Sequence, residues 1–187
     1  KNLEMLKPGG RMLIIVPDGV VSARGLASTL RDHLRNRVVV RAIFDLPTET
    51  FAQAGTRTKT ALLYLVNNKP TEDTKSVLGV IENLGFKVSL KKGVQTKVFS
   101  GTNELDGVIH TIGTATDKED LEILSESPSI VRTQQRVLAD SGWTPVHYSA
   151  SRIRMIDEIS SQSDVNVLPL TEVAFFESQE RRAEKPL

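Results

Sequence analysis

A short, uninterrupted apolar run near the start of the chain, Met12 to Val16, limits the fold most strongly. Lys7-Pro-Gly-Gly10 precedes the run and Pro17-Asp-Gly19 follows it, so turn-forming residues bound it on both sides. A run of this length suits a strand rather than a helix, and continuous apolarity is typical of a strand that is covered on both faces. We therefore expect a central strand of an α/β sheet at residues 11–16.

The residues after this strand predict a βαβ unit. Ser22 suits the N-cap position of a helix, and Leu26, Leu30 and Leu34 recur at a spacing of four, which is typical of an amphipathic helix. A second apolar segment, residues 38–46, reads as the next strand. Strand, helix and strand in this order predict a right-handed crossover between two parallel strands.

A polar loop over residues 47–59 separates the second strand from a third, over residues 60–66. Loops of this length within a compact fold tend to be functional. Because no helix intervenes, we expect the second and third strands to be antiparallel neighbours. The turn that follows is taken as the boundary between a first part, residues 1–69, and a second part, residues 70–187.

The pattern weakens after this boundary. We expect strands over 76–81 and 85–90, with a turn at 91–93. A short helix over 104–112, capped by Asn103, and a helix from residue 116 or 117 through Leu124 should follow. The last elements are an irregular segment over 125–150 and a helix over 152–159. The second part is thus expected to be a less regular α+β extension.

Composition excludes several kinds of site. The 187-residue chain contains no cysteine, which excludes a disulfide framework and a cysteine-type zinc site, and its three histidines lack metal-ligand spacing. No apolar run approaches the ~20 residues that span a bilayer. The first residues do not read as a signal peptide. We therefore expect no metal, no membrane partner and a cytoplasmic location.

Charge is unevenly distributed although the net charge is only +1. Residues 1–69 contain 11 basic and 5 acidic residues, whereas residues 70–187 contain 13 basic and 18 acidic residues. A basic first third suits a phosphate-bearing partner. A solvated basic face on the helix over 24–37 is the simpler explanation, with Arg24, Arg31, Arg35, Arg37 and Arg41 as the residues concerned.

Two segments resemble a known family. These are Leu6-Lys-Pro-Gly-Gly-Arg-Met-Leu-Ile-Ile-Val-Pro-Asp-Gly19 and the block that runs from Val40 through Leu46-Pro-Thr-Glu-Thr-Phe51 and Gly55-Thr-Arg-Thr-Lys-Thr60 to Leu65. Together they resemble the C-terminal half of an N6-adenine DNA methyltransferase domain, as in the modification subunits of type I restriction–modification systems. The resemblance implies the last three strands of a Rossmann-like, S-adenosylmethionine-dependent methyltransferase sheet, with the final strand antiparallel.

The departures from the family are as informative as the matches. The family holds its methyl donor at a Gly-rich turn after the first strand and the adenine amino group with an Asn-Pro-Pro-aromatic motif. Neither motif occurs in this sequence. The resemblance therefore implies that the donor site and the catalytic motif lie upstream of Lys1, that S-adenosylmethionine is bound mainly there, and that this chain alone is inactive.

Phe51 is the candidate base-binding residue. An enzyme that acts on a base within a duplex must flip it out and hold it against an apolar or flat surface, and the resemblance places an aromatic residue here, near the flipped adenine. Alternatively, Phe51 pins the loop to the sheet.

The candidate DNA-binding residues are Arg57, Thr58, Lys59, Thr60 and Asp18. Cations and hydroxyls at residues 57–60 suit phosphate oxygens, although the start of a solvent-facing strand would show the same residues. Asp18 follows a strand at the end where α/β sheets bind ligands. It can contact DNA or a neighbouring loop, or belong to a plain turn.

Two other functions remain open at this point. The first is a non-catalytic nucleic-acid-binding or assembly module with a methyltransferase-like sheet, and the second is part of an RNA methyltransferase. Under the DNA methyltransferase reading, the expected partners are DNA, the specificity and restriction subunits or a missing N-terminal half. The second part of the chain then leads toward a target-recognition or partner-binding region.

Overall fold

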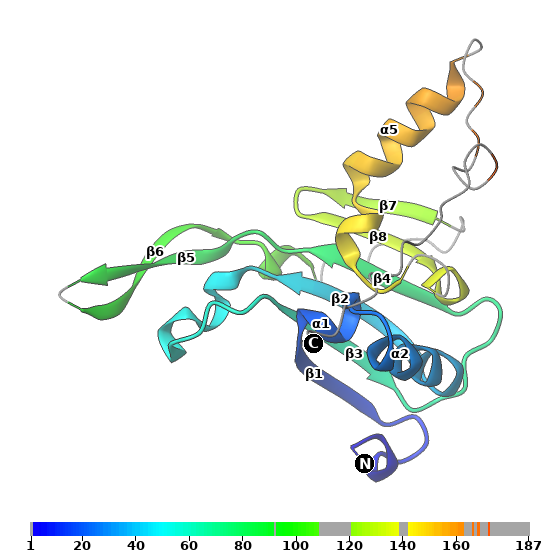
Figure 1. Ribbon diagram of the computed structural model, residues 1–187, viewed down its shortest axis with the longest axis horizontal. Helices are drawn as coiled ribbons and strands as arrows, with labels where there is room; N and C mark the ends of the chain where they lie inside the picture. Colours follow the sequence, from blue (N-terminus) through cyan, green and yellow to red (C-terminus); the bar gives the residue numbers. More distant parts are fainter. Residues whose placement is uncertain are drawn as a thin grey trace, which may run out of the picture. The chain divides into compact units, whose positions relative to one another are not determined.

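The computed structural model describes residues 2–91, 93–108, 121–138 and 142–162, together with residues 166, 168 and 172. The chain divides into two compact units, residues 1–153 and 154–187. The first unit contains a six-stranded sheet with the strand order β1-β3-β2-β4-β8-β7 and a separate two-stranded sheet of β5 and β6 (Figure 1). Its strands are β1 (Arg11–Pro17), β2 (Val39–Leu46), β3 (Thr60–Val66), β4 (Lys75–Val80), β5 (Leu84–Lys91), β6 (Val94–Asn103), β7 (Leu121–Glu126) and β8 (Ser129–Gln134).

The three predicted strands of the first part are confirmed, and so is the antiparallel pairing of the second with the third. β3 pairs antiparallel with β2 on one side and with β1 on the other. β1 and β2 are therefore parallel to each other, with β3 inserted between them. This is the antiparallel last strand that the family resemblance implies.

β1 lies at the edge of the sheet and not at its centre, so the prediction of a strand covered on both faces is wrong for this chain. Its side chains alternate between half-buried and exposed. Met12, Ile14 and Val16 pack toward the core, whereas Leu13 and Ile15 are 66% and 45% exposed. β1 is apolar on both faces, yet among the described residues it pairs with a strand on one side only, although its sequence suits a strand with two neighbours.

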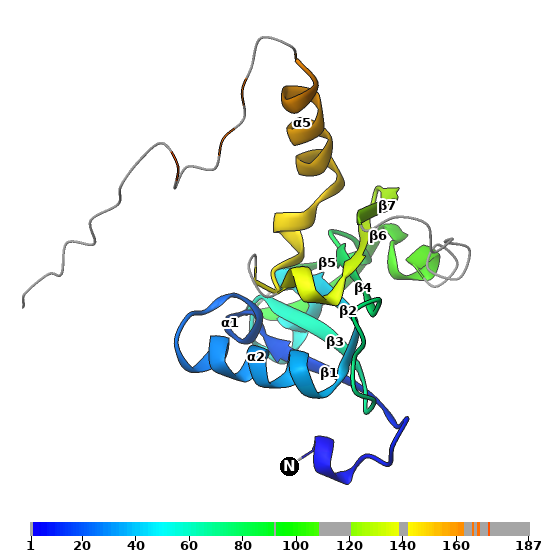
Figure 2. The ribbon, with the colours of Figure 1, turned by 90° about the vertical axis from the view of Figure 1, so that its right-hand side faces the viewer.

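Two helices, not one, connect β1 to β2. α1 (Asp18–Ser22) ends at the residue predicted to begin the helix, because the Ser22 hydroxyl donates back to Asp18 within the same turn. α2 (Leu26–Arg37) starts after Gly25, whose φ is +68°. Figure 2 shows both helices on one side of the β1-β3-β2 sheet.

The buried face of α2 also differs from the predicted one. Leu34 is buried, but Leu26 is 88% exposed. Arg31, expected on the solvated face, is instead buried and donates a hydrogen bond from Nη1 to the carbonyl oxygen of Val20 at 2.9 Å. The helix therefore packs through its C-terminal half, with an arginine tying it to α1.

The sheet continues through the predicted boundary at Lys69. β4 pairs parallel with β2, β8 pairs antiparallel with β4, and β7 completes the sheet. The helix expected through Leu124 is wrong where it overlaps β7, and the segment expected to be irregular contains β8. In both cases the pairing of β7 with β8 decides the conformation, which local patterns do not reveal.

The predicted strand over 76–81 is confirmed as β4, and the expected strand over 85–90 is confirmed as β5, which pairs with β6. The expected turn at 91–93 includes residue 92, which lies outside the described residues. Asn103 Oδ1 accepts from the backbone nitrogen of Leu105 at 3.3 Å, at the start of a helical turn over 105–108. The rest of that expected helix lies outside the described residues. Short 3₁₀ helices complete the first unit: η1 (Leu3–Met5), η2 (Thr48–Ala54), η3 (Gln135–Val137) and η4 (Pro145–Tyr148).

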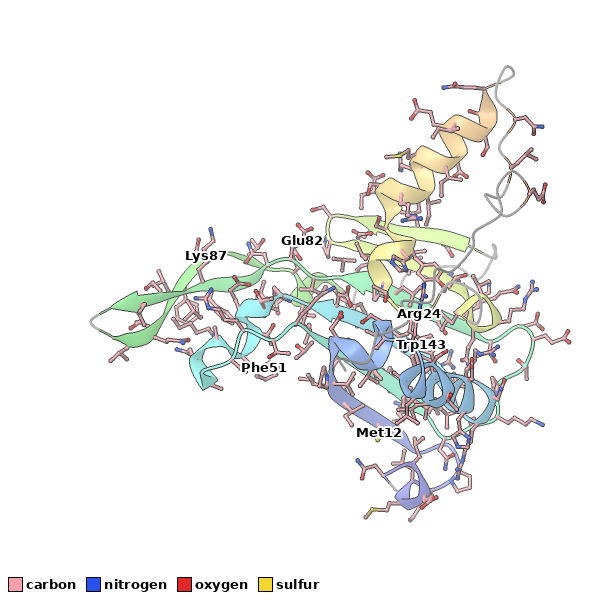
Figure 3. The ribbon with its side chains drawn as sticks, in the orientation of Figure 1. Met12, Arg24, Phe51, Glu82, Lys87 and Trp143 are labelled. Carbon is pink, nitrogen blue, oxygen red and sulfur yellow. The ribbon has the colours of Figure 1, made fainter. Side chains whose placement is uncertain are left out.

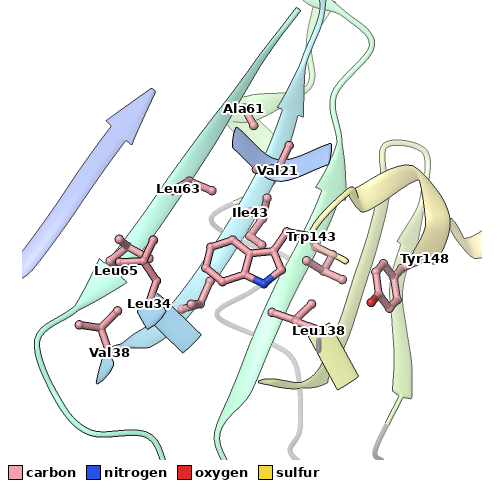
Figure 4. Close-up of a cluster of buried hydrophobic side chains, with 12 residues drawn as sticks. Val21, Leu34, Val38, Ile43, Ala61, Leu63, Leu65, Leu138, Trp143 and Tyr148 are labelled. Atoms are coloured by element: carbon pink, nitrogen blue, oxygen red, sulfur yellow. The ribbon is translucent and has the colours of Figure 1, made fainter. Parts of the chain in front are cut away.

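The core of the first unit lies on the two faces of the sheet. One cluster joins α1 and α2 to the sheet and includes Trp143, which is 1% exposed (Figure 4). Trp143 thereby anchors the segment before η4 to this cluster. The other cluster, on the opposite face, surrounds Phe44 and includes Val77 and Ile130.

α5 (Ala150–Ser161) confirms the helix expected over 152–159, and it starts in the first unit and continues into the second. None of the helices in the described part of the chain has the length and apolarity needed to cross a membrane.

Candidate functional site

The carboxyl ends of β1 and β2 meet the start of β3 at one end of the sheet. Thr60 is the register partner of Pro17 in β1 and of Leu46 in β2. The loop over 47–59 leaves and returns at this point, and its first half forms η2. The residues predicted to bind DNA therefore come together where α/β sheets place their ligands.

An ion-pair cluster lies at the base of this loop. Lys59 Nζ is 3.0 Å from Asp45 Oδ2 and 3.4 Å from Asp18 Oδ1, so one ammonium joins two carboxylates from β2 and α1. The backbone nitrogen of Asp18 also donates to the carbonyl oxygen of Lys59 at 3.0 Å. Asp18 thus contacts a neighbouring loop, which is one of the roles predicted for it. Lys59, predicted to meet phosphate, is held by carboxylates.

The two members of the closer pair differ in burial and in pKa. Asp45 is 2% exposed, and this burial raises the pKa of its carboxyl above the ordinary value, which pairing with Lys59 only partly offsets. Burial alone would lower the pKa of Lys59, but its hydrogen bond and charge interaction with Asp45, together with Asp18, outweigh burial and raise it. The ammonium is therefore firmly charged at neutral pH, and the cluster fixes the end of the loop to the sheet.

Sequence reasoning did not single out Asp45. The sequence does mark Asp45 as unusual, because it is the only acidic residue in the apolar run of β2. A charge in a buried strand is expected to be paired, but its partner is 14 residues away and was assigned to the DNA instead.

Phe51 lies in η2, directly after β2 and at the same end of the sheet (Figure 3). Its backbone interrupts the helical turn, with φ −115° and ψ 15°, and its side chain is half-buried. Phe51 is not among the described residues that form the two apolar clusters. A half-exposed ring on a kinked turn leaves one part of the aromatic surface open to a ligand.

The remaining predicted DNA-binding residues differ in exposure. Arg57 and Thr58 are exposed, and Thr58 shares a hydrogen bond with the hydroxyl of Thr56 at 2.7 Å. Thr60 is buried, and its hydroxyl oxygen is shielded from solvent without a hydrogen-bond partner. Its position does not support a contact to phosphate, because the strand pairing on both sides encloses it.

A cavity of about 330 Å³ adjoins the cluster and is lined by Asp45, Leu46, Pro47, Thr48, Glu49, Lys59, Val80, Ile81, Glu82 and Val146. Its carboxylates include Asp45 and Glu49, which disfavours a phosphate in this cavity itself. Among the described residues, no group of three or more acidic or histidine side chains is arranged to hold a metal ion.

A family model described as N-6 DNA Methylase matches residues 1–119 of the chain. The chain belongs to the N-6 DNA methylase family. The match covers β1 to β6, and thus includes the loop with Phe51 and the ion-pair cluster. No curated protein matches the chain.

One solved structure shares the fold of this N-6 DNA methylase chain. It belongs to a type I restriction–modification methyltransferase subunit from Streptococcus thermophilus, which is 14% identical to this chain. The match covers 75% of this chain and 26% of that subunit, with a TM-score of 0.50. The M protein of the type I restriction enzyme EcoKI is 27% identical over 42% of this chain and 17% of its own, with a TM-score of 0.35. The chain therefore spans about a quarter or less of these proteins.

Proposed function

We propose that the chain is part of an N6-adenine DNA methyltransferase in a type I restriction–modification system. The complete enzyme transfers a methyl group from S-adenosylmethionine to the amino nitrogen of an adenine flipped out of the duplex. The observation that carries the proposal is the family match over residues 1–119. The antiparallel pairing of β3 with β1 and β2 supports it, because an antiparallel final strand is what the resemblance implies.

The residues of this chain do not fit the methyl donor. The turn after β1 contains no Gly-x-Gly, and its Asp18 is occupied by Lys59 and by the Ser22 hydroxyl. We therefore assign no residue of the chain to S-adenosylmethionine and place donor binding and the Asn-Pro-Pro-aromatic motif in the remainder of the enzyme.

The free edge of β1 is the place where that remainder joins. Within the described part of the chain no strand pairs with the outer side of β1, and Leu13 and Ile15 are exposed on the face away from α1 and α2. A further strand from the catalytic domain would pair with this edge and cover these side chains. The other partners in the proposal are DNA and the specificity and restriction subunits.

Within this chain, Phe51 is assigned to the flipped adenine and Arg57 and Thr58 to the neighbouring phosphates. Phe51 has an open aromatic surface at the carboxyl end of β2, and the two polar residues are exposed on the returning half of the loop. The ion-pair cluster acts indirectly, since Lys59 holds the end of the loop against Asp45 and Asp18.

The test is Phe51→Ala in the complete enzyme. Base–aromatic stacking contributes roughly 1–3 kcal/mol, so DNA binding or turnover should fall by about one to two orders of magnitude, while donor binding stays unchanged. Phe51→Leu, which keeps an apolar side chain without the ring, should recover stability but not stacking. Intact methylation by a Phe51→Ala enzyme that has lost several kcal/mol of stability would assign Phe51 to the core instead.

A further inference from the structure

The β5–β6 ribbon, residues 84–103, is the largest part of the first unit that the proposed function does not use. Among the described strands, β5 and β6 pair only with each other, and they extend away from the six-stranded sheet (Figure 1). The base of the ribbon is held firmly. The Glu104 carboxylate accepts from the backbone nitrogens of Glu82 at 2.8 Å and Asn83 at 3.1 Å, and Asn83 Oδ1 accepts from the nitrogen of Gly85 at 2.8 Å.

The outer ribbon has no core of its own. Phe99 is 81% exposed and Leu90 is 69% exposed, and Val94 and Val98 are also largely accessible. A two-stranded ribbon is at best marginally stable alone in water. Exposed apolar side chains grouped on one projecting element are typical of a surface that a partner covers.

The charge of the ribbon indicates which partner this is. Residues 84–103 contain four lysines and no acidic residue, in a chain whose net charge is +1. Lys87 is exposed, and Lys97 Nζ lies 3.6 Å from the centroid of the Phe86 ring and 5.5 Å from that of Phe99. The rings hold the Lys97 ammonium without neutralising it, so the ribbon presents cations combined with aromatic surface.

The ribbon also lies beside the element that carries the proposed base-binding residue. Both strands pack against η2, the element that carries Phe51. Figure 3 shows Lys87 on the ribbon and Phe51 on the neighbouring turn. A cavity of about 490 Å³ at the base is lined by Glu49, Glu82 and Glu104 as well as Lys87, so the acidic groups lie at the base while residues 84–103 contribute only lysines.

We propose that the β5–β6 ribbon binds duplex DNA beside the target adenine, with Lys87 and Lys97 on the phosphates and Phe99 against the groove wall. The proposal rests on the proposed function, from which it takes the position of the base. A two-stranded ribbon has the width that the major groove admits. Charge of a single sign favours a phosphate backbone over a protein surface, which would be expected to match mixed charges.

The experiment measures binding of the 187-residue chain to a fluorescent duplex of mixed sequence, by anisotropy across a range of salt concentrations. The unmodified chain should bind, with log K falling linearly against log salt. Lys87→Gln with Lys97→Gln should flatten this slope by about one per lysine and weaken binding at least about tenfold near 0.1 M salt. Lys97→Arg keeps both charge and ring contact and should bind like the unmodified chain.

Lys69→Gln is the matched control, because Lys69 is also exposed but belongs to the turn after β3. It should leave the slope unchanged. If Lys97→Gln disturbs the ribbon, Lys87→Gln alone must still lower the slope by about one. Absence of binding by the unmodified chain, or an unchanged slope in both ribbon variants, overturns the inference. Methyl transfer by the complete enzyme is a separate readout, so the ribbon can fail while the proposed function stands.

Discussion

The side-chain oxygen of Gln135 accepts a hydrogen bond at 2.8 Å from the backbone nitrogen of Val40, which lies 95 residues earlier in the chain. The Nε2 group of the same side chain donates to the carbonyl oxygens of Arg35 at 2.8 Å and Val38 at 3.0 Å. One buried amide thus satisfies the end of α2 and the start of β2 together. It ties η3, which follows β8, to α2 and β2.

Gln135→Ala should therefore lower the free energy of unfolding by about 1–3 kcal/mol, since the Val40 nitrogen is left buried without a partner. Denaturant unfolding measures the change. Gln53→Ala, at an exposed position in η2, is the control and should be nearly neutral. If the denaturant concentration at the midpoint of unfolding is the same for Gln135→Ala as for the unmodified chain, water replaces the hydrogen bonds of the amide without loss of stability.

The contact between Phe44 and Gly79 gives a second prediction. The two residues are register partners in β2 and β4, and Phe44 Cε1 lies 2.5 Å from the point where a Cβ on Gly79 would be. Gly79→Ala should destabilise the fold by about 1–3 kcal/mol through overpacking.

A double-mutant cycle tests whether the clash with Phe44 causes this loss of stability. Phe44→Leu combined with Gly79→Ala should cost less than the sum of the single changes, because the shorter side chain leaves room for the methyl group. Gly107→Ala, where an added Cβ meets open space, is the control. Strict additivity of the two changes would exclude the clash as the reason.

The ion-pair cluster predicts a pH-dependent effect for Lys59→Gln. At pH 7 the variant leaves the buried Asp45 carboxylate without its cation and should lose about 1 kcal/mol, a modest figure because solvent reaches the 43% exposed Lys59 side chain. As the pH falls through the raised pKa of Asp45, this carboxyl takes up a proton and no longer needs the cation. The difference between variant and unmodified chain should then vanish toward pH 3.

At high pH the stabilising contribution of Lys59 is lost for a different reason, because Lys59 itself loses its charge. The raised pKa of Lys59 means that its contribution to stability is complete below the ordinary value of 10.5 and is lost as the pH rises through the value in the folded chain. Unfolding curves at several pH values measure both limits. Arg57→Gln, at an exposed position in the same loop, should show neither trend, and equal losses at pH 3 and pH 7 for Lys59→Gln would exclude the pairing with Asp45.

The last prediction concerns the methyl donor. The isolated chain should not bind S-adenosylmethionine stoichiometrically at micromolar concentration, because it has no Gly-x-Gly turn and Asp18 after β1 is already paired. Calorimetric titration is the measurement. Tight binding by this chain would require a donor site within residues 1–187 and would contradict the proposed division of the enzyme.

Local pattern was sufficient for β1, β2, β3, β4 and α5, where apolar runs and turn residues agree with the final pairing. It was insufficient for β7, whose Leu121 and Ile123 also suit a helix and are fixed only by their register partners Thr133 and Val131. The apolarity of β1 suggested a central strand, whereas its edge position follows from the family resemblance, which makes this chain only the last three strands of the family's sheet.

The candidate site divides in the same way. Phe51, Arg57 and Asp18 were proposed from residue type, position and family resemblance, and the structure places them around the end of the sheet where β1 and β2 finish. The pairing of Lys59 with Asp45 was missed because a loop lysine reads equally well as a ligand for phosphate, and only the fold brings the buried carboxylate within 3.0 Å. Burial of Thr60 follows from strand pairing on both sides and has no local signature.

The position of β3 between β1 and β2 also orders the assembly of this sheet during synthesis. The two earlier strands have no hydrogen bonds to each other in the final register, and each pairs with β3 along its length. Their backbone groups consequently remain unsatisfied by one another until residue 66 has left the ribosome, however well α2 has formed by then. The parallel strands β1 and β2 are therefore joined only once β3 has been made, so the crossover unit closes with its last strand.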